Sequence, residues 1–165
     1  MDSFSFLSIG TNSGNRINNI KSLLIEFEKN NVNIISISSI YKAEPFRSQS
    51  NSFFYNLVLK IETNLDLQAF FALTESIEMK MGRIVKNNPD IPRVIDIDIL
   101  VFNNKVYKSK YLIIPHPKIH ERKFVLLPWS EISGKYILPK YNQSVNNLLN
   151  NVKDTSKICK LKTTL

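Results

Sequence analysis

The chain has 165 residues, of which 43% are hydrophobic and 22% are charged, and its formal net charge at pH 7 is +8. This size and apolar content predict a single folded domain over residues 1–165, and the lack of any run of roughly 18 apolar residues argues against a membrane protein. The N-terminus has no basic leader, and the one cysteine, Cys159, has neither a disulfide partner nor the spacing of a metal site. We therefore expect a cytoplasmic protein.

The positive charge indicates an anionic partner, but it does not distinguish a nucleotide from nucleic acid or a membrane surface. Lysine is spread along the chain, as expected of a solvated surface, whereas arginine is rare. The planar guanidinium group suits bidentate contacts with phosphate, so each arginine is a candidate phosphate ligand as well as a candidate structural residue. The arginines are Arg16, Arg47, Arg83, Arg93 and Arg122.

The first part of the chain alternates between strand and helix patterns. Apolar residues alternate over 4–9, where we expect a strand, and recur every three or four residues over 17–30, where we expect a helix. The segment between them, 10–15, lacks the Gly-Lys-Ser/Thr of a phosphate-binding loop, so it is interpreted as a turn. The next expected elements are a strand over 32–40, a mobile polar loop over 42–52 and a strand over 53–63.

One polar side chain stands out within the strand over 53–63. Asn56 lies on the face opposite the apolar side chains that are expected to form the core. An asparagine is costly to bury without hydrogen-bond partners, so Asn56 either bonds the backbone or contacts a polar ligand. The expected core face consists of Tyr55, Leu57, Leu59 and Ile61.

The second part of the chain begins with a well-marked helix. Asp66 is a suitable N-cap residue for it, and Gly82 is a suitable residue to end it. The expected elements, in order, are a helix over 67–81, a second mobile loop near 86–91, a strand over 92–102, a tight turn at 103–104 that leads into a hairpin strand at 105–107, a helix over 144–152 and a frayed tail after residue 153.

Two carboxylates interrupt the strand over 92–102. Side chains alternate across a strand, so Asp96 and Asp98 share one face, about 7 Å apart, while the neighbouring isoleucines share the core face. Two negative charges in a half-buried place are unfavourable unless a cation joins them. Oxygen ligands favour Mg²⁺ bound together with substrate phosphates, which points to a nucleotide. The alternative is a solvated strand face without a ligand.

The order strand, helix, strand, strand, helix, strand is that of a ferredoxin-like α+β domain, in which an antiparallel sheet carries both helices on one face. We expect the C-terminal part of the chain to extend this βαββαβ core with further sheet and with additional C-terminal helices. The open face of the sheet would hold a ligand, with Asp96 and Asp98 at its floor.

Short motifs are distributed along almost the whole chain. The two most specific are P-R-x-x-D-x-D, which begins at Pro92, and P-H-P-x-x-x-x-R-x-F-V-L, which begins at Pro115. Weaker motifs are Ile9–Asn12, Ser38–Tyr41 with Pro45, Phe54–Asn56 with Glu62 and Thr63, and Glu78 with Gly82 and Arg83. In combination they resemble the 6-hydroxymethyl-7,8-dihydropterin pyrophosphokinase family of folate biosynthesis.

The resemblance implies transfer of pyrophosphate from ATP to the hydroxymethyl oxygen of 6-hydroxymethyl-7,8-dihydropterin, with release of AMP. Two Mg²⁺ ions bound with ATP would be held by Asp96 and Asp98, and arginines would contact the phosphates. The implied catalytic residues are Arg83, Arg93, Asp96 and Asp98. The implied ATP-binding residues are Glu78, Arg83, Arg93, Ile99, His116 and Arg122. The alternative for His116 is that it is a loop histidine without a chemical role.

The resemblance also implies a pterin site in which two aromatic side chains stack on the ring and polar groups bond its edge. The implied substrate-binding residues are Ala43, Glu44, Phe46, Phe54, Asn56, Asp96 and Phe124, and each phenylalanine has a core position as its alternative. The two polar loops would close over the substrates and exclude water. The chain departs from familiar family members at Ala43, Arg47, Phe54, Val85 and Asp90, which puts the pterin contacts and loop closure in question.

Two other classes of protein are weighed against this interpretation. A ferredoxin-like RNA-binding module fits the fold and the charge, but Asp96 and Asp98 would repel a phosphate backbone, and the Gly-Phe-x-Phe pattern of such modules is lacking. A nucleotidyltransferase with a D-x-D motif would place a Gly-Ser helix start shortly before the carboxylates, and it would release pyrophosphate instead of AMP. We therefore expect a monomer that binds ATP and the pterin, with neither nucleic acid nor a membrane as partner.

Overall fold

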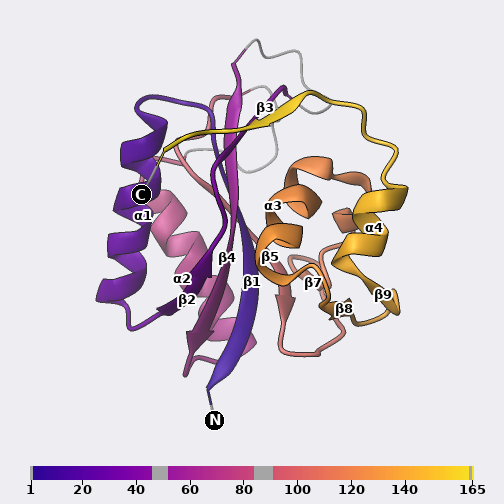
Figure 1. The fold of residues 1–165 in the computed structure, drawn as a ribbon. Coiled ribbons are helices and arrows are strands. Elements are labelled where there is room, and N and C mark those ends of the chain that lie inside the picture. Colours follow the sequence, from indigo (N-terminus) through magenta and orange to yellow (C-terminus); the bar gives the residue numbers. More distant parts are fainter. Residues whose placement is uncertain (1, 46–51, 84–90, 164) are drawn as a thin grey trace.

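The structure is a computed structural model that describes residues 2–45, 52–83, 91–163 and 165 (Figure 1). Within this part of the chain, a six-stranded antiparallel sheet has the order β10-β3-β4-β1-β5, and β2 pairs with β4 beside β3. The elements are β1 (Ser3–Thr11), α1 (Arg16–Lys29), β2 (Asn33–Ile37), β3 (Tyr41–Ala43), β4 (Phe54–Thr63), α2 (Leu67–Lys80), β5 (Asp96–Phe102), β6 (Tyr107–Lys108), β7 (Ile113–Ile114), a 3-10 helix (Ile119–Glu121), α3 (Lys123–Ser133), β8 (Ile137–Leu138), β9 (Gln143–Ser144), α4 (Val145–Asn151) and β10 (Ile158–Lys160). The predicted ferredoxin-like α+β core is confirmed.

The first face of the sheet carries α1 and α2, as the sequence predicts (Figure 1). Both helices begin where a polar side chain caps them: the side chain of Asn15 accepts a hydrogen bond from Asn18 N, and that of Asp66 accepts one from Ala69 N. A hydrophobic cluster fills the space between these helices and the sheet. It includes Leu7, Ile9, Ile20, Leu23, Phe27, Phe70, Ile77, Ile95, Ile97 and Ile99.

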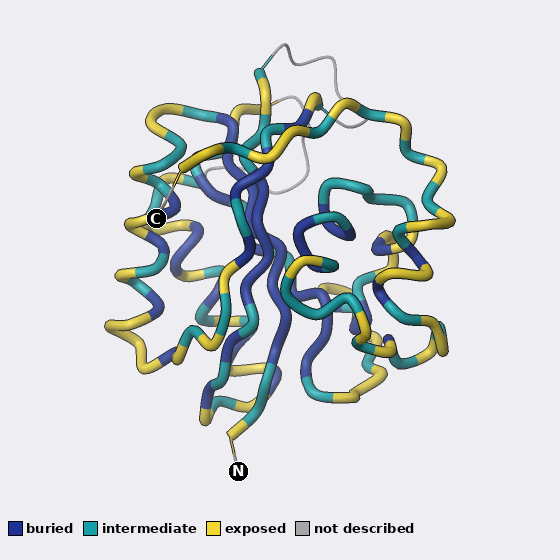
Figure 2. Tube along the Cα trace, viewed as in Figure 1, coloured by how far each residue is buried: buried dark blue, intermediate teal, exposed yellow. Residues whose placement is uncertain are grey.

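The second face of the sheet is covered by α3, and α4 packs against α3, whereas the sequence led us to expect an open ligand-binding face (Figure 1). A second buried cluster around Phe6, Val58, Leu100 and Trp129 lies there. Consequently the central strands are buried on both sides (Figure 2). β4 shows this two-sided burial directly, because Val58 is as fully buried as Leu57, Leu59 and Ile61 of the expected core face.

The strand expected over 32–40 is divided in two. β2 ends at Ile37 and β3 begins at Tyr41, and both pair with β4, at residues 59–62 and 54–56 respectively. Between them, Ser38 N donates to Val58 O at 3.0 Å, and Ser38 Oγ accepts from Val58 N at 2.9 Å. The hydroxyl group of Ser38 therefore replaces a backbone partner, so the chain can change direction without leaving β4 unpaired.

The expectation of a frayed tail after residue 153 is wrong. β10 pairs with β3 in antiparallel register, with Ile158 opposite Ala43 and Lys160 opposite Tyr41. The pairing continues at Leu161 N, which donates to Ile40 O at 2.8 Å. Lysine-rich composition does not prevent this pairing, because charged side chains on an edge strand face solvent and protect the edge.

Two further expectations need correction near the carboxylates. The strand expected to begin at Pro92 begins at Asp96, and the turn at 103–104 leads into β6, which pairs with β7 and not with β5. Asn103 adopts the expected positive φ, at 49°. As a result β5 lies at an edge of the sheet, and its outer side is free to line a site.

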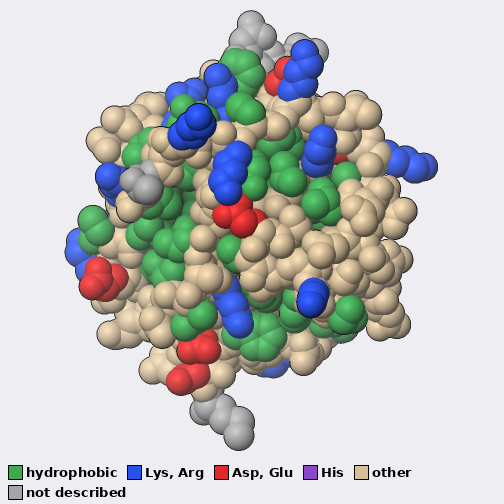
Figure 3. Space-filling model, viewed as in Figure 1, with side chains coloured by type: hydrophobic (Ala, Val, Ile, Leu, Met, Phe, Trp, Pro, Cys, Tyr) green, Lys and Arg blue, Asp and Glu red, His purple; other side chains and the backbone are tan. Residues whose placement is uncertain are grey.

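The surface agrees with the predicted spread of positive charge. In Figure 3, Lys and Arg side chains occur at separate places across the visible face and do not form one continuous patch. Within the ranges that the structure covers, the helices are too short or too polar to cross a membrane.

Candidate active site

A row of residues crosses the sheet at one end of its central strands. In the strand register, Gly10 of β1 lies between Asn56 of β4 and Asp96 of β5. A Cβ atom on Gly10 would lie 3.2 Å from Asn56 Oδ1, 3.9 Å from Phe54 Cδ1 and 4.0 Å from the Cβ of Asp96. A larger residue at position 10 would therefore push into the space that these three side chains share. The β-sheet register thus brings together Gly10, Asn56 and Asp96, although 46 residues separate the first two positions and 40 the last two.

The first carboxylate of β5 is held by two arginines. Arg83 follows α2 and donates to Asp96 Oδ1 at 2.6 Å, while Arg93, in the segment before β5, donates to Asp96 Oδ2. Arg83 also pairs with Glu78 of α2, and Glu78 Oε1 accepts from Ile97 N at 2.7 Å. Charge-assisted pairs of this kind are stronger than neutral hydrogen bonds, so they fix both guanidinium groups beside β5.

The second carboxylate of β5 has a separate set of partners. Arg122, which precedes α3, donates from Nη1 to Asp98 Oδ2 at 2.8 Å, and its guanidinium group lies 5.6 Å from the ring centroid of Phe124. His116 Nε2 lies 3.9 Å from the same Asp98 oxygen. The side chain of Asp98 is 32% exposed, compared with 16% for Asp96. Asp98 is therefore the more accessible of the two carboxylates.

The three site arginines have unused donors. Their Nε atoms are buried and find no hydrogen-bond acceptor among the described residues. The side-chain nitrogens of Asn12 and Asn56 are in the same condition. Buried donors without partners are uncommon, and they are typical of sites that bind an acceptor-rich ligand.

Burial of His116 disfavours the charged imidazole and lowers its pKa below the ordinary value of 6.5, which favours the neutral form. His116 Nδ1 accepts a hydrogen bond from Lys118 N at 3.2 Å. In a neutral imidazole the other nitrogen then carries the proton, so His116 Nε2 is a donor directed toward Asp98.

Glu78 is the most deeply buried carboxyl group of the site, with 3% of its side chain exposed. Its pKa is raised to about 7, chiefly by burial; the hydrogen bond from Ile97 and the charge of Arg83 oppose this rise, and the charge of Asp96 adds to it. A carboxyl group whose pKa is raised in the folded state binds its proton more tightly there than in the unfolded chain. Glu78 therefore stabilises the fold below its ordinary pKa of 4.5, and this contribution is lost as the pH rises through about 7.

We predict that this loss disappears in Glu78→Gln, which keeps an oxygen acceptor for Ile97 N but cannot ionise. Between pH 5 and pH 8 the free energy of unfolding of the wild type should fall relative to that of the variant, by at most about 1.4 kcal/mol per pH unit. Urea denaturation at several pH values, monitored by the fluorescence of the buried Trp129, measures the free energy of unfolding of the wild type and of the variant. Parallel pH profiles for the two proteins would contradict the prediction.

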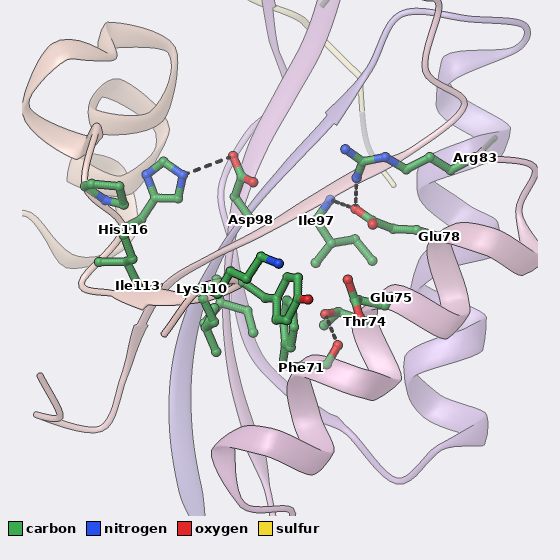
Figure 4. A pocket seen from close by; sticks show the side chains of 14 residues that line it. Phe71, Thr74, Glu75, Glu78, Arg83, Ile97, Asp98, Lys110, Ile113 and His116 are labelled. Atoms are coloured by element: carbon green, nitrogen blue, oxygen red, sulfur yellow. Dashed lines mark hydrogen bonds and ion pairs between the residues drawn. The ribbon is translucent and has the colours of Figure 1, made fainter. Parts of the chain in front are cut away.

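A cavity of about 690 Å³ opens beside the outer side of β5 (Figure 4). Glu78 and Arg83 lie at one end of it, and His116 and Asp98 lie at the other, with α2 forming one wall. Its volume is in the range of sites for drug-sized ligands. The lining residues are Phe71, Thr74, Glu75, Glu78, Arg83, Ile97, Asp98, Ile99, Lys110, Tyr111, Leu112, Ile113, His116 and Pro117.

The carboxylates suit Mg²⁺ that is bound together with phosphate. Both contacts of Asp98 use Oδ2, so Oδ1 accepts no hydrogen bond from the described residues. The described part of the chain holds no cluster of three or more His, Cys, Asp or Glu that would form a complete protein cage for a metal. Mg²⁺ rarely uses such cages, since it binds through one or two carboxylates, water and substrate phosphates. The donor set therefore fits this ion.

The remaining predicted site residues fall into three groups. Phe54, Asn56 and Ala43 lie close together, because Ala43 pairs with Phe54 in the β3–β4 register. Glu44 follows β3, where its N–H donates to Lys157 O at 3.4 Å, and its side chain is exposed. Phe46, Arg47, Val85 and Asp90, together with the main parts of the two loops expected to close over the substrates, lie outside the described residues.

Two sets of site residues were missed by reasoning from the sequence. Asn12 accepts from Arg93 N at 2.6 Å and donates its own N–H to Arg93 O at 3.0 Å, so the first loop positions Arg93. Phe71, Thr74 and Glu75 line the cavity from α2, beside Glu78, which the family resemblance already implied. These residues recur at intervals of three and four, so they share one face of α2. This partly polar face differs from the apolar core face, and it is the feature of the sequence that could have revealed the cavity wall.

Comparison with known families decides what kind of protein carries this site. The sequence model described as "7,8-dihydro-6-hydroxymethylpterin-pyrophosphokinase (HPPK)" matches residues 6–134, which include both carboxylates and the site arginines. The chain belongs to this family. The match extends over most of the chain, well beyond the short motifs.

Individual relatives agree with the HPPK assignment. The chain is 32% identical over 133 residues to the 2-amino-4-hydroxy-6-hydroxymethyldihydropteridine pyrophosphokinase of Bacillus subtilis. The aligned residues cover 80% of this chain and 79% of that protein. It is 34% identical over 149 residues to the folic acid synthesis protein of Pneumocystis carinii, covering 90% of this chain and 20% of the relative. The chain therefore spans about a fifth of the length of such curated relatives.

The fold is also that of solved HPPK structures. A crystal structure of HPPK-DHPS from Plasmodium falciparum superposes with a TM-score of 0.70 at 17% sequence identity, and the match covers 91% of this chain and 45% of that one. At this identity the likeness concerns the fold alone.

Proposed function

We propose that the protein is a 2-amino-4-hydroxy-6-hydroxymethyldihydropteridine pyrophosphokinase, which transfers pyrophosphate from ATP to 6-hydroxymethyl-7,8-dihydropterin and releases AMP. The observation that carries this proposal is the pair of β5 carboxylates, each bound by arginine and placed beside a cavity of about 690 Å³. In a chain of the HPPK family, this arrangement supplies a phosphate site and a metal site next to each other.

ATP is the proposed occupant of the cavity beside β5. The apolar part of its lining, which includes Phe71 and Ile99, suits a flat base, and the polar ends suit the phosphates. Arg83 lines this cavity, and Arg93 and Arg122 are held beside β5 by their carboxylate partners. Because these side chains are already ordered by ion pairs, binding the phosphates costs little additional side-chain entropy.

The reaction breaks the bond between the β-phosphorus and the oxygen that bridges it to the α-phosphate, which leaves with AMP. The pterin hydroxyl oxygen forms the new bond to the β-phosphorus and releases its proton to solvent. Negative charge grows on the departing AMP, and the site arginines stabilise it. Mg²⁺ bound by Asp96 and Asp98 would neutralise phosphate charge and lower the pKa of the attacking hydroxyl. Neutral His116 is proposed to donate a hydrogen bond from Nε2 to an oxygen atom of ATP on the Asp98 side of the cavity. A count of two metal ions stays a prediction.

The pterin is proposed to lie at the row formed by Asn56, Gly10 and Asp96. Asn56 Nδ2 is a buried donor that finds no acceptor in the described part of the chain, so a ring heteroatom would satisfy it. Phe54 is within 4 Å of the position that a Cβ of Gly10 would take, and Phe124 lies next to Arg122. Phe54 lies beside the row, and Phe54 and Phe124 are the proposed stacking surfaces for a flat heterocycle.

The experiment that tests the proposed function measures AMP release from ATP and Mg²⁺, with and without 6-hydroxymethyl-7,8-dihydropterin. We expect AMP to form only when the pterin is present, in an amount equal to the pyrophosphorylated pterin. Release of free pyrophosphate would instead support the nucleotidyltransferase alternative. RNA binding that weakens steeply with salt, in a protein that forms no AMP, would support the RNA-binding module.

A substitution at Gly10 tests where the pterin binds. In Gly10→Ala the added methyl group would approach Asn56 Oδ1 to 3.2 Å, so the asparagine must shift. We expect the KM for the pterin to rise about fivefold to tenfold, which corresponds to the loss of roughly one hydrogen bond, while the KM for ATP changes little. Steady-state kinetics with each substrate varied in turn gives the two KM values separately. An unchanged KM for the pterin would place the pterin site elsewhere.

Three further properties belong to the same proposal. Residues 1–165 are proposed to act as one pyrophosphokinase domain, to work as a monomer and to reside in the cytoplasm. Size-exclusion chromatography with light scattering measures the oligomeric state directly. The family assignment favours ATP and the pterin as partners over nucleic acid, since a structure of an HPPK-DHPS relative has been solved with substrates.

A further inference from the structure

The motif Ser38–Tyr41 has no role in the site described so far, although it is part of the family pattern. It forms the break in the edge of the sheet and leads directly into β3. β3 is three residues long and ends at Ala43, next to the proposed pterin site. So short a strand has few ladder hydrogen bonds of its own, and its position depends on what holds it at each end.

One acidic side chain from the opposite layer holds this segment. Glu131 of α3 accepts through Oε1 from Ser39 N at 3.1 Å and from Ser39 Oγ at 2.8 Å. Its other oxygen, Oε2, accepts from Tyr41 Oη at 2.8 Å. Lys160 of β10, the strand on the outer side of β3, lies 3.5 Å from Glu131 Oε1. A single carboxylate therefore connects α3, the Ser39–Tyr41 segment and β10.

The protonation states support this arrangement. Burial and the hydrogen bond to Glu131 raise the pKa of Tyr41 to about 12, so its hydroxyl group remains a donor. Partial burial alone would raise the pKa of Glu131, but the hydrogen bonds from Ser39 and Tyr41 lower it below its ordinary value. Both groups thus keep the charge state that the contact requires at neutral pH.

The contact is transmitted to the site through the strand register. Tyr41 is buried and pairs with Asn56, and Ala43 pairs with Phe54. Asn56 is the residue with the unpartnered donor, next to Gly10. A shift of Tyr41 therefore moves β3, which is the strand that pairs with Asn56 and Phe54.

We propose that Glu131 is a positioning residue for the pterin: it ties α3 and β10 to the Ser39–Tyr41 segment and so fixes β3 and the edge of the pterin site. Glu131 does not touch substrate in this assignment, and it acts through Tyr41 and β3. The inference rests on the proposed function, because it assumes that the pterin binds beside β3 and β4.

The test compares Glu131→Ala with Glu131→Gln, and it uses Glu28→Ala on the exposed side of α1 as the matched control. In Glu131→Ala we expect the KM for the pterin to rise about tenfold, equal to the loss of roughly one charge-assisted hydrogen bond, while the KM for ATP stays within about twofold. Glu131→Gln should recover part of this loss, because its amide oxygen still accepts from Ser39. Glu28→Ala should behave as wild type.

A second readout does not depend on catalysis. Hydrogen exchange of the amides over 41–44 should become faster in Glu131→Ala, while exchange over β1 stays unchanged. If Glu131→Ala fails to fold, Tyr41→Phe removes only one of the hydrogen bonds and should raise the KM for the pterin about threefold, as expected for a contact of roughly 0.6 kcal/mol.

The possible results separate the two proposals. A pterin KM that is unchanged in Glu131→Ala, or that rises together with the ATP KM, overturns the positioning role of Glu131. Lower thermal stability with wild-type KM values also overturns it, because that outcome describes a purely structural contact. If the wild type forms no pterin-dependent AMP, the proposed function fails, and the exchange rates over 41–44 still decide whether Glu131 anchors β3.

Discussion

Asp98→Ala should reduce pterin-dependent AMP release by at least about a thousandfold, with the protein still folded. The lost carboxylate is the more accessible ligand of the proposed metal site, and metal stabilisation of phosphate charge contributes several kcal/mol, at about 1.4 kcal/mol per tenfold in rate. Its side chain contributes no atom to either hydrophobic cluster. Single-turnover AMP formation and thermal unfolding, measured on the same preparation, check both parts of this result.

The control for this substitution is Glu28→Gln, which removes one negative charge from an exposed helix position far from the carboxylates in sequence. It should retain wild-type activity. Asp96→Ala should lose activity to the same extent, and it should also be less stable, because Asp96 joins Arg83 to Arg93. Near wild-type turnover in either aspartate variant would rule out the proposed metal site.

Arg122→Ala is expected to lower kcat about a hundredfold to a thousandfold. Arg122 contacts Asp98 and lies against Phe124, so its guanidinium group is positioned before the phosphates arrive. Removing one donor that stabilises transition-state charge commonly costs this much. Arg122→Lys should recover only part of the rate, because lysine keeps the charge but lacks the planar fork. Steady-state kinetics with both substrates saturating gives the relevant kcat.

Lys80→Ala is the matched control for Arg122→Ala. It removes one positive charge at a side chain that is 63% exposed and pairs with Glu26, and such a surface pair contributes little to stability. Its kcat should equal that of the wild type. If Arg122→Ala were to stay within threefold of the wild type, the phosphate would have to be held by other residues.

The elements with strong local signals were predicted well. α1 and α2 have regular apolar spacing and polar N-caps, and they begin within one residue of the expected positions. The alternation of carboxylates and isoleucines in β5 placed Ile95, Ile97 and Ile99 in the core, where they are buried. These features depend on interactions between residues close in sequence, which is why periodicity alone reveals them.

The elements that depend on distant partners were predicted poorly. β10 has no apolar alternation of its own, and it exists as a strand because β3 offers an unpaired edge. The break between β2 and β3 depends on Ser38 Oγ bonding to β4, and nothing in the local pattern marks it. Additional C-terminal helices were expected, but the position of α3, which contains Pro128, was not.

For the site, the sequence by itself determined the chemistry: two carboxylates on one strand face, arginines available as their partners, and the family motifs that contain them. Only the tertiary structure decided which groups meet. It assigned Arg83 and Arg93 to Asp96, assigned Arg122 and His116 to Asp98, and aligned Asn56 with Gly10 and Asp96 across three strands. The physical reason is that residue type sets charge and hydrogen-bonding capacity, whereas contact between residues distant along the chain is set by strand register and by helix packing on both faces of the sheet.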